Sequence, residues 1–119
     1  MKINALGDGF TKTMDTAFDS AATRFLAALT SAFEDALPAA EVDLEGGVLT
    51  VELEGGGTYV INKHAPTRQI WLSSPASGAT HFARDQGSDR WIDTRGGRDL
   101  ARLLTDEIRA ATGAELALG

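Results

Sequence analysis

Residues 57–78 of the chain read GTYVINKHAPTRQIWLSSPASG. Apolar and polar residues alternate on both sides of Pro66, and such alternation is typical of β-strands. Proline has no amide hydrogen for a sheet, so we place a turn at Pro66, between two strands. Tyr59 and Ile61 share one face of the first strand, as Ile70 and Leu72 do in the second. We predict that this face is buried and that the outward face carries Asn62, Gln69 and Trp71.

The segments around this pair continue the pattern. Alternating runs over residues 41–45 and 48–53 are separated by Gly46-Gly47, a dipeptide that favours a tight hairpin turn. Three glycines, residues 55–57, form the next turn, and two weaker strands follow near His81-Phe82 and Trp91-Ile92. We therefore expect a sheet of about five to six strands joined by short turns.

Two amphipathic helices are predicted outside the strands. The first runs from about residue 11 to 37, before Pro38, and the second from about Arg98 to Thr112, before Gly113. The apolar face of the first helix consists of Met14, Phe18, Ala21, Phe25, Leu29, Phe33 and Ala36. That of the second consists of Leu100, Leu103, Leu104, Ile108 and Ala111.

The order helix, strands, helix predicts an α+β fold. Strands joined by hairpins are antiparallel, and two flanking helices can both cover one face, which gives a two-layer α-β sandwich. At 119 residues the chain has the length of one domain, residues 1–119, of which we expect 1–9 to be a flexible N-terminus. The solvent face of the sheet should carry Val48, Thr50, Glu52, Val60, Asn62, Gln69 and Trp71.

Charge is distributed unevenly along the chain. Residues 1–54 carry ten acidic and three basic residues and residues 55–119 carry seven and eight, so balances of −7 and +1 sum to the net −6. An acidic half argues against nucleic acid, whose binding depends on phosphate neutralisation, and favours cations or a basic protein surface. The other interpretation is a solvated face that only aids solubility.

Several classes of site are excluded by composition. The chain has no cysteine, hence no disulfide, thiolate metal ligand or cysteine nucleophile. His64 and His81 lack metal-ligand spacing, and no P-loop, HExxH or Gly-x-Ser-x-Gly sequence occurs, so no catalytic residue is predicted. No apolar run has signal-peptide or membrane-spanning length. We expect an intracellular protein without membrane contact, or a mature form whose targeting segment is absent.

Carboxylates form one candidate ligand set. If the 41–45 strand packs beside the first helix, they form a row along one edge, made of Asp15, Asp19, Glu34, Asp35, Glu41 and Asp43. Exposed oxygen ligands suit hard cations such as Fe²⁺, Mn²⁺, Ca²⁺ or Mg²⁺, with low affinity and poor selectivity. Because like charges in the row repel one another, a bound cation should raise the melting temperature.

Trp71 has two interpretations. A tryptophan on the solvent side of a sheet suits an interaction surface, because tryptophans often contribute much of the binding energy. Alternatively, Trp71 folds over neighbouring aliphatic residues as a local cover. The residues alone leave this choice open.

Three segments make the chain resemble the frataxin family. They are GGVLTVEL at residues 46–53, the 57–78 segment, and Trp91 followed by an L-x-x-L-L-x-x-E-I helix from Leu100 to Ile108. The resemblance covers nearly everything from Phe10 onward. It implies the α-β sandwich expected above, in a bacterial frataxin close to the mitochondrial branch.

The resemblance also implies a function. Frataxins bind ferrous and ferric iron weakly through acidic residues of the first helix and first strand. They dock on the cysteine desulfurase–scaffold complex of iron–sulfur cluster assembly, where they modulate sulfur transfer and supply or sense iron. By position, the implied metal residues are Asp15, Asp19, Glu34, Asp35, Glu41 and Asp43. The implied partner-binding residues are Asn62, Lys63, Gln69, Trp71 and His81, which favours the contact interpretation of Trp71.

Departures from the family pattern matter. Ala27, Ala28 and Thr30 stand where relatives often carry acids, so fewer irons should bind. His81 stands where mitochondrial relatives carry a basic residue that contacts the complex. It could make that contact when protonated, or lend iron a nitrogen ligand.

We therefore expect an iron-binding protein that modulates cluster assembly. It should be a monomer, with iron-driven oligomers left open, in the bacterial cytoplasm or, as a processed organellar form, in the mitochondrial matrix. One alternative is a ferroxidase, against which the lack of a buried His/carboxylate di-iron pattern counts. The other is iron storage or metallochaperone activity through oligomers, for which the chain encodes no clear interface.

Overall fold

A computed structural model describes the backbone of residues 4–118 and the side chains of residues 11–118. A long helix is followed by six strands and a second helix, with a short 3₁₀ turn, η1, between the third and fourth strands. The elements are α1 (Asn4–Ala36), β1 (Glu41–Glu45), β2 (Val48–Glu52), β3 (Thr58–His64), η1 (Ala65–Thr67), β4 (Gln69–Ser74), β5 (Gly78–Asp85), β6 (Arg90–Asp93) and α2 (Leu100–Thr112).

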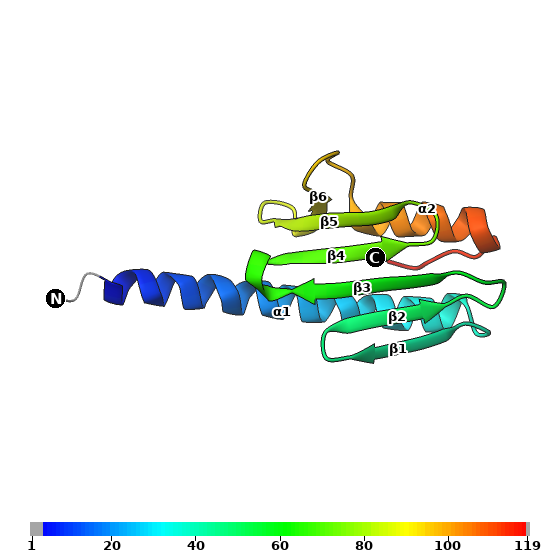
Figure 1. Cartoon of the computed structure of the whole chain (residues 1–119), viewed down its shortest axis with the longest axis horizontal. Coiled ribbons are helices and arrows are strands. Elements are labelled where there is room, and N and C mark those ends of the chain that lie inside the picture. Colours follow the sequence, from blue (N-terminus) through cyan, green and yellow to red (C-terminus); the bar gives the residue numbers. More distant parts are fainter. Residues whose placement is uncertain (1–3, 119) are drawn as a thin grey trace.

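The six strands form one sheet in chain order, so that β1 and β6 are its two edges (Figure 1). Every neighbouring pair is antiparallel. Gly46 and Gly47 have φ angles of 59° and 79°, which glycine adopts without strain, and their two-residue turn places Glu45 opposite Val48. The same register places Glu41 opposite Glu52 at the far end of the hairpin.

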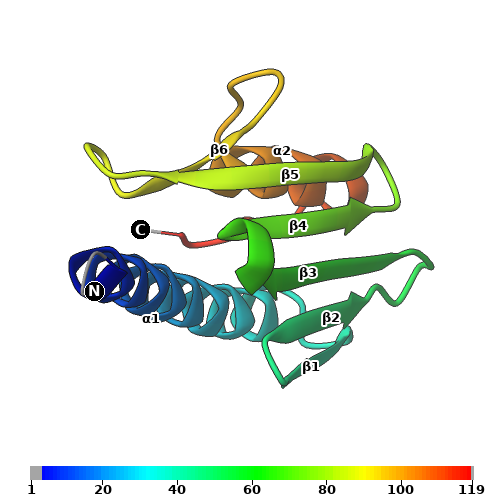
Figure 2. The same cartoon turned by 60° about the vertical axis from the view of Figure 1, so that its left-hand side comes forward.

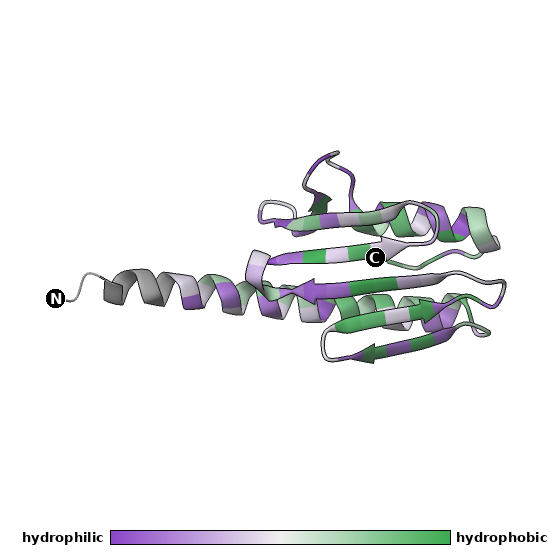
Figure 3. Ribbon diagram, in the orientation of Figure 1, coloured by the Kyte–Doolittle hydropathy of each residue, from purple (hydrophilic) through white to green (hydrophobic). Residues whose placement is uncertain are grey.

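Both helices cover the same face of the sheet and leave the other face open (Figures 1 and 2). Hydrophobic and hydrophilic residues alternate most clearly along β1 and β4 (Figure 3). Alternate residues of β2, β3 and β4 are buried, so each of these strands contributes one side to the core. The largest fully buried side chains come from both layers and include Phe33, Leu49, Tyr59, Ile61, Ile70, Phe82, Leu104 and Ile108. The predicted two-layer α+β sandwich is confirmed.

The helix bounds differ in part from the prediction. α1 begins at Asn4 rather than near residue 11, since no proline interrupts the segment before the periodic region, and it ends at Ala36. Residues 1–3 lie outside the described residues and residues 4–9 belong to α1, so the flexibility proposed for 1–9 stays a prediction. Within the described residues, no helix combines the length and the apolar character needed to cross a membrane.

The second helix begins at Leu100 because Asp99 caps it. The Asp99 carboxylate accepts a hydrogen bond from the backbone amide of Arg102, at 3.3 Å. Gly113, with φ 78°, follows the last turn, and its amide donates to the Arg109 carbonyl. Gly113, before which the sequence placed the helix end, is therefore the C-terminal cap of α2.

The side chain of Trp91 packs β6 against α1. Its side chain is buried, and its ring lies 5.9 Å from that of Phe18, edge to face, and 6.1 Å from that of Phe25. Such aromatic pairs add to the free energy gained by burying large apolar surfaces. Trp91 is thus a core residue.

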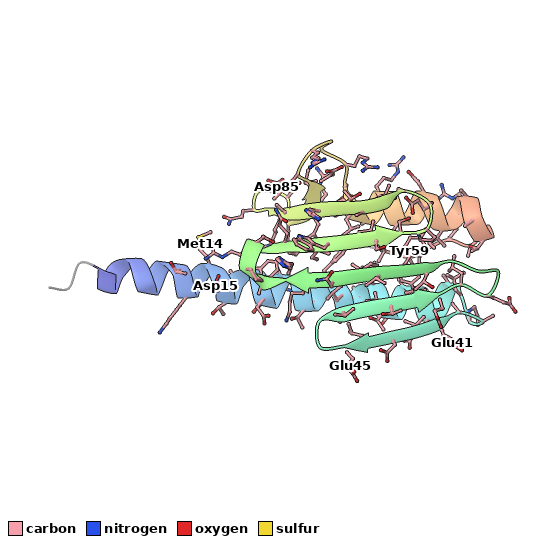
Figure 4. The ribbon with its side chains drawn as sticks, viewed as in Figure 1. Met14, Asp15, Glu41, Glu45, Tyr59 and Asp85 are labelled. Atoms are coloured by element: carbon pink, nitrogen blue, oxygen red, sulfur yellow. The ribbon has the colours of Figure 1, made fainter. Side chains whose placement is uncertain are left out.

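A buried hydroxyl connects the sheet to α2. Tyr59 donates a hydrogen bond of 2.8 Å to Oε1 of Glu107, and Ser74 donates one of 2.6 Å to the same oxygen. Burial, together with the hydrogen bond and negative charge of Glu107, raises the pKa of the Tyr59 hydroxyl from 10.0 to about 12. Figure 4 shows Tyr59 on the sheet.

We expect Tyr59 to make stability depend on alkaline pH. In the unfolded chain the hydroxyl ionises near pH 10, but in the folded protein only near pH 12, so stability falls as pH rises between these values. The loss from this group approaches about 2–3 kcal/mol at the upper end of the window. Tyr59→Phe should remove that slope and cost about 1 kcal/mol at neutral pH through the lost hydrogen bond.

The measurement is direct because Tyr59 is the one tyrosine of the chain. Tyrosinate absorbance reports its ionisation, while far-UV circular dichroism shows whether the protein is still folded. An ionisation midpoint near pH 10 in the folded protein would contradict the assignment.

Candidate functional site

The open face of the sheet carries a cluster of rings at its centre. Trp71 on β4 lies directly across from Asn62 on β3 and from His81 on β5. His64 is diagonal to Trp71, because its own cross-strand partner is Gln69. Side chains at diagonal positions remain within reach when they are large and flat.

The three rings form a stack, which we call the ring stack: His64, Trp71 and His81. The centroid of Trp71 lies 3.6 Å from that of His64 and 4.3 Å from that of His81, and each imidazole plane is within 11° of the indole plane. The indole Nε1 donates a hydrogen bond of 2.8 Å to Oε1 of Gln69. Nδ1 of His64 lies 2.8 Å from Oγ1 of Thr67.

This geometry determines what a partner can contact. Imidazoles cover both faces of the half-buried indole, so a docking molecule meets the edges of the rings and the outer face of His81, which is exposed. Neighbouring contacts already restrict the rings, so binding costs little additional side-chain entropy. The ring stack is therefore a partly exposed aromatic cluster with restricted side chains, next to Asn62 and Gln69 on the open face.

Four of the five predicted partner-binding residues lie together on this face: Asn62, Gln69, Trp71 and His81. Lys63 does not, because strand alternation turns it toward α1, where its Nζ lies 2.6 Å from Oδ1 of Asp19. His64 was missed by the sequence analysis. The available signal was its position two residues after Asn62 on the same strand face.

The predicted row of metal-binding carboxylates is divided by the structure. Asp15 and Asp19 on α1 are exposed, and each carries a basic partner: Nε of Arg68 is 2.7 Å from Asp15, and Lys63 is bound to Asp19. These carboxylates are already neutralised in part. Figure 4 shows Asp15 far along the molecule from Glu41 and Glu45.

The other four predicted metal residues are exposed and lie toward the opposite end of the molecule. Glu34 and Asp35 are in the last turn of α1, and Glu41 and Asp43 are on β1. Glu41 and Asp43 have Glu52 and Thr50 as cross-strand neighbours, on the solvent face. In the described part of the chain, no three His, Asp or Glu side chains are grouped closely enough to hold a metal ion.

The structure adds a carboxylate that the predicted set lacked. Glu52 on β2 faces Glu41 directly, and both line a cavity of about 350 Å³ with Glu54. Like charges opposite each other in a sheet destabilise it, so a cation between them would relieve repulsion. The two-residue turn at Gly46-Gly47 already implied this pairing.

We call the carboxylates of β1 and β2 the acidic region: Glu41, Asp43, Glu45 and Glu52. Carboxylate oxygens on an exposed strand fit a hard divalent cation such as Fe²⁺. Glu41 and Glu52 would offer at most two carboxylates to such a cation, and water would have to supply its other ligands, since no third His, Asp or Glu side chain of the described residues is close enough.

Comparisons with known proteins agree on one family. The family model described as a frataxin-like domain matches residues 11–114. The iron–sulfur cluster assembly protein CyaY of Cupriavidus taiwanensis is 38% identical over 106 residues, which are 86% of this chain and 93% of that protein. The mitochondrial frataxin of Dictyostelium discoideum is 52% identical over 68 residues, which are 57% of this chain and 35% of that protein. The mitochondrial frataxin homolog of Saccharomyces cerevisiae is 43% identical over 83 residues, 70% of this chain and 45% of that protein.

The chain thus spans less than half of these two mitochondrial relatives and nearly all of the bacterial one. Among solved structures, a trimeric yeast frataxin complexed with ferrous iron superposes with a TM-score of 0.59 at 37% identity, covering 84% of this chain and 86% of that one. The frataxin of Psychromonas ingrahamii gives a TM-score of 0.74 at 24% identity, covering 86% and 94%, which supports the fold alone.

Proposed function

The chain belongs to the frataxin family, and on that premise we propose that it is an iron-binding protein of iron–sulfur cluster assembly. It docks on the complex of cysteine desulfurase and scaffold protein through the ring stack and modulates sulfur transfer there. The acidic region of β1 and β2 holds the iron. Its place of action is the bacterial cytoplasm, or the mitochondrial matrix if the chain is an organellar form.

The observation that carries this proposal is the ring stack. A tryptophan that served only as a cover would lie over aliphatic neighbours, whereas Trp71 is stacked between two imidazoles and donates a hydrogen bond to Gln69. Tryptophan is enriched among the residues that contribute most to protein–protein binding. Asn62 and Gln69, beside it, provide polar groups at the rim.

Iron binding and docking use different parts of the sheet. The acidic region lies at the β1 edge, while the ring stack lies on β3, β4 and β5. The protein can therefore hold a cation while its centre is covered by a partner. A pull-down of the desulfurase–scaffold complex of the same organism, with and without Fe²⁺, tests both parts; no capture in either condition would overturn the docking proposal.

A titration with Mn²⁺ should locate the cation site. Its paramagnetism should broaden the backbone amides of Glu34 to Asp43 and of Glu52 first, because these acids lack described basic partners. Asp15 and Asp19 should respond later, since Arg68 and Lys63 already compensate them. At a hundredfold excess over Kd, the cation should stabilise the fold by about 2.7 kcal/mol.

Two variants test which carboxylates bind the cation. Glu41→Gln with Glu52→Gln should weaken Mn²⁺ binding several-fold and remove most of the thermal stabilisation. Lys63→Met should bring the Asp19 amide into the early response. Broadening centred on His81 in the unchanged protein would instead move the metal site to the ring stack.

A second candidate function is iron storage or oxidation through oligomers. It is favoured by the description of a similar yeast frataxin as trimeric and complexed with ferrous iron. Saturable Fe²⁺ oxidation that is lost on one point substitution would support it. Sedimentation with increasing iron separates it from the docking function, which needs only the monomer.

A further inference from the structure

The loop between β6 and α2 encloses a second polar site, at the edge of the sheet opposite β1. A cavity of about 360 Å³ lies between this loop and the start of β5. Figure 1 shows the loop in gold, beyond the end of β6. Its polar lining residues are Thr80, His81, Asp93, Thr94, Arg95 and Arg98.

Asp93 holds the loop in shape. Its buried carboxylate accepts the backbone amide of Arg95 at 2.8 Å and two guanidinium nitrogens of Arg98 at 3.0 and 3.1 Å. The Arg95 amide, then that of Gly96 and the Arg98 side chain, keep the pKa of Asp93 below its ordinary value. A side chain at Gly96 would crowd Asp93, since a Cβ there would lie 3.1 Å from Oδ2. These contacts therefore fix the backbone conformation of the loop that carries Arg95 and Arg98.

The charge of the cavity is positive at neutral pH. Two guanidinium groups against one carboxylate leave one net positive charge. The Arg98 side chain is 48% exposed and uses only part of its donors on Asp93, while no described side chain pairs with the Arg95 guanidinium. The cavity offers these donors and two threonine hydroxyls to an anion.

The cavity is also continuous with the ring stack. His81 lines it and is at the same time the outer ring of the stack. The backbone amide of Thr94 donates to the His81 carbonyl at 2.9 Å, which fixes the loop beside that strand. A protein docked on the His81 side of the ring stack therefore also lies next to the cavity.

We infer that this cavity binds a carboxylate side chain, an Asp or Glu, of the protein that docks on the ring stack. The inference rests on the proposed function. One net positive charge matches a single carboxylate, whereas a doubly charged phosphate would meet the Asp93 carboxylate with less compensation. The free donors are exposed, so an untethered anion is held weakly, and a carboxylate delivered by a docked surface gains from its high effective concentration.

Charge reversal at Arg95 tests the inference. Arg95→Glu keeps the backbone hydrogen bond to Asp93 and should weaken binding of the desulfurase–scaffold complex about tenfold. Arg90→Glu is the matched control, because it makes the same charge change on the adjacent strand outside the cavity and should weaken binding less than threefold. Arg95→Lys should retain most of the affinity. Melting temperatures of all three variants check that the fold is kept.

A second measurement separates the cavity from the proposed function. Sodium acetate, compared with sodium chloride at equal ionic strength, should shift the amides of Thr80, Thr94, Arg95 and Gly96 in the unchanged protein but not in Arg95→Glu. Equal losses of affinity for the complex in Arg95→Glu and Arg90→Glu would overturn the inference. So would the absence of amide shifts specific to acetate. If the complex does not bind the unchanged protein, both the proposed docking function and the proposed origin of the carboxylate in the docked protein are refuted. The acetate titration still shows whether the cavity binds a carboxylate.

Discussion

Trp71→Ala is expected to weaken binding of the desulfurase–scaffold complex by about 2 kcal/mol, roughly thirtyfold in Kd, and to leave the protein folded. The substitution removes the middle ring, so that His64 and His81 lose the surface that positions them. Trp71 lies on the open face, outside the helix-covered core, so the cost to stability should be about 1 kcal/mol. Calorimetric titration with the complex and thermal unfolding give the two quantities.

Two controls show whether the lost affinity belongs to the ring stack. Trp71→Phe keeps an aromatic ring but loses the hydrogen bond to Gln69, and should retain part of the affinity. Mn²⁺ binding should be unchanged in Trp71→Ala, because the acidic region lies at the β1 edge. Unchanged binding of the complex by Trp71→Ala would refute the proposal that the ring stack is the docking surface.

Trp91→Ala should have the opposite profile, with a loss of about 3–5 kcal/mol in the free energy of unfolding. The ring is buried against Phe18 and Phe25, so its removal opens a cavity where β6 meets α1. For a domain of this size the melting temperature should fall by roughly 10–20 °C. Urea unfolding followed by circular dichroism measures the change.

The loss is a large part of the stability of a typical domain, so a milder variant is needed beside Trp91→Ala. Trp91→Phe is the milder variant, expected to cost about 1–2 kcal/mol through a smaller cavity. It should still bind the desulfurase–scaffold complex with unchanged affinity, because the ring stack is on the other sheet face. A Trp91→Phe protein as stable as the unchanged one would argue against tight packing of this ring.

Much of the fold was predictable from local pattern. The alternation in residues 57–78 correctly assigned Tyr59, Ile61, Ile70 and Leu72 to the core and Asn62, Gln69 and Trp71 to the open face. Alternation works here because β3 and β4 are each buried on one side only, so a shift of one residue would expose the apolar side. The start of α1 was harder to place, because Gly7 and Gly9 are poor helix formers and precede the clear apolar periodicity.

Contacts between individual side chains were less predictable than the face of the sheet on which a residue lies. Resemblance grouped Lys63 with Trp71, although alternation along β3 places it beside Asp19. The pairing of Arg68 with Asp15 joins residues far apart in the chain and depends on how α1 lies across the sheet. The same holds for the ring stack, since the diagonal contact of His64 with Trp71 depends on sheet geometry that no sequence pattern records.

The position of β1 at the edge of the sheet has one further consequence. An edge strand leaves backbone groups unpaired, and these can template a strand from another copy. The acids on β1 should repel those of another copy, next to Leu44 and Val48, which are 40% and 37% exposed. A cation bound to these acids, as proposed above, would remove that repulsion. On that proposal, metal loading and solubility would be coupled through one short strand, and the most heavily loaded molecules would be the most prone to assemble edge to edge.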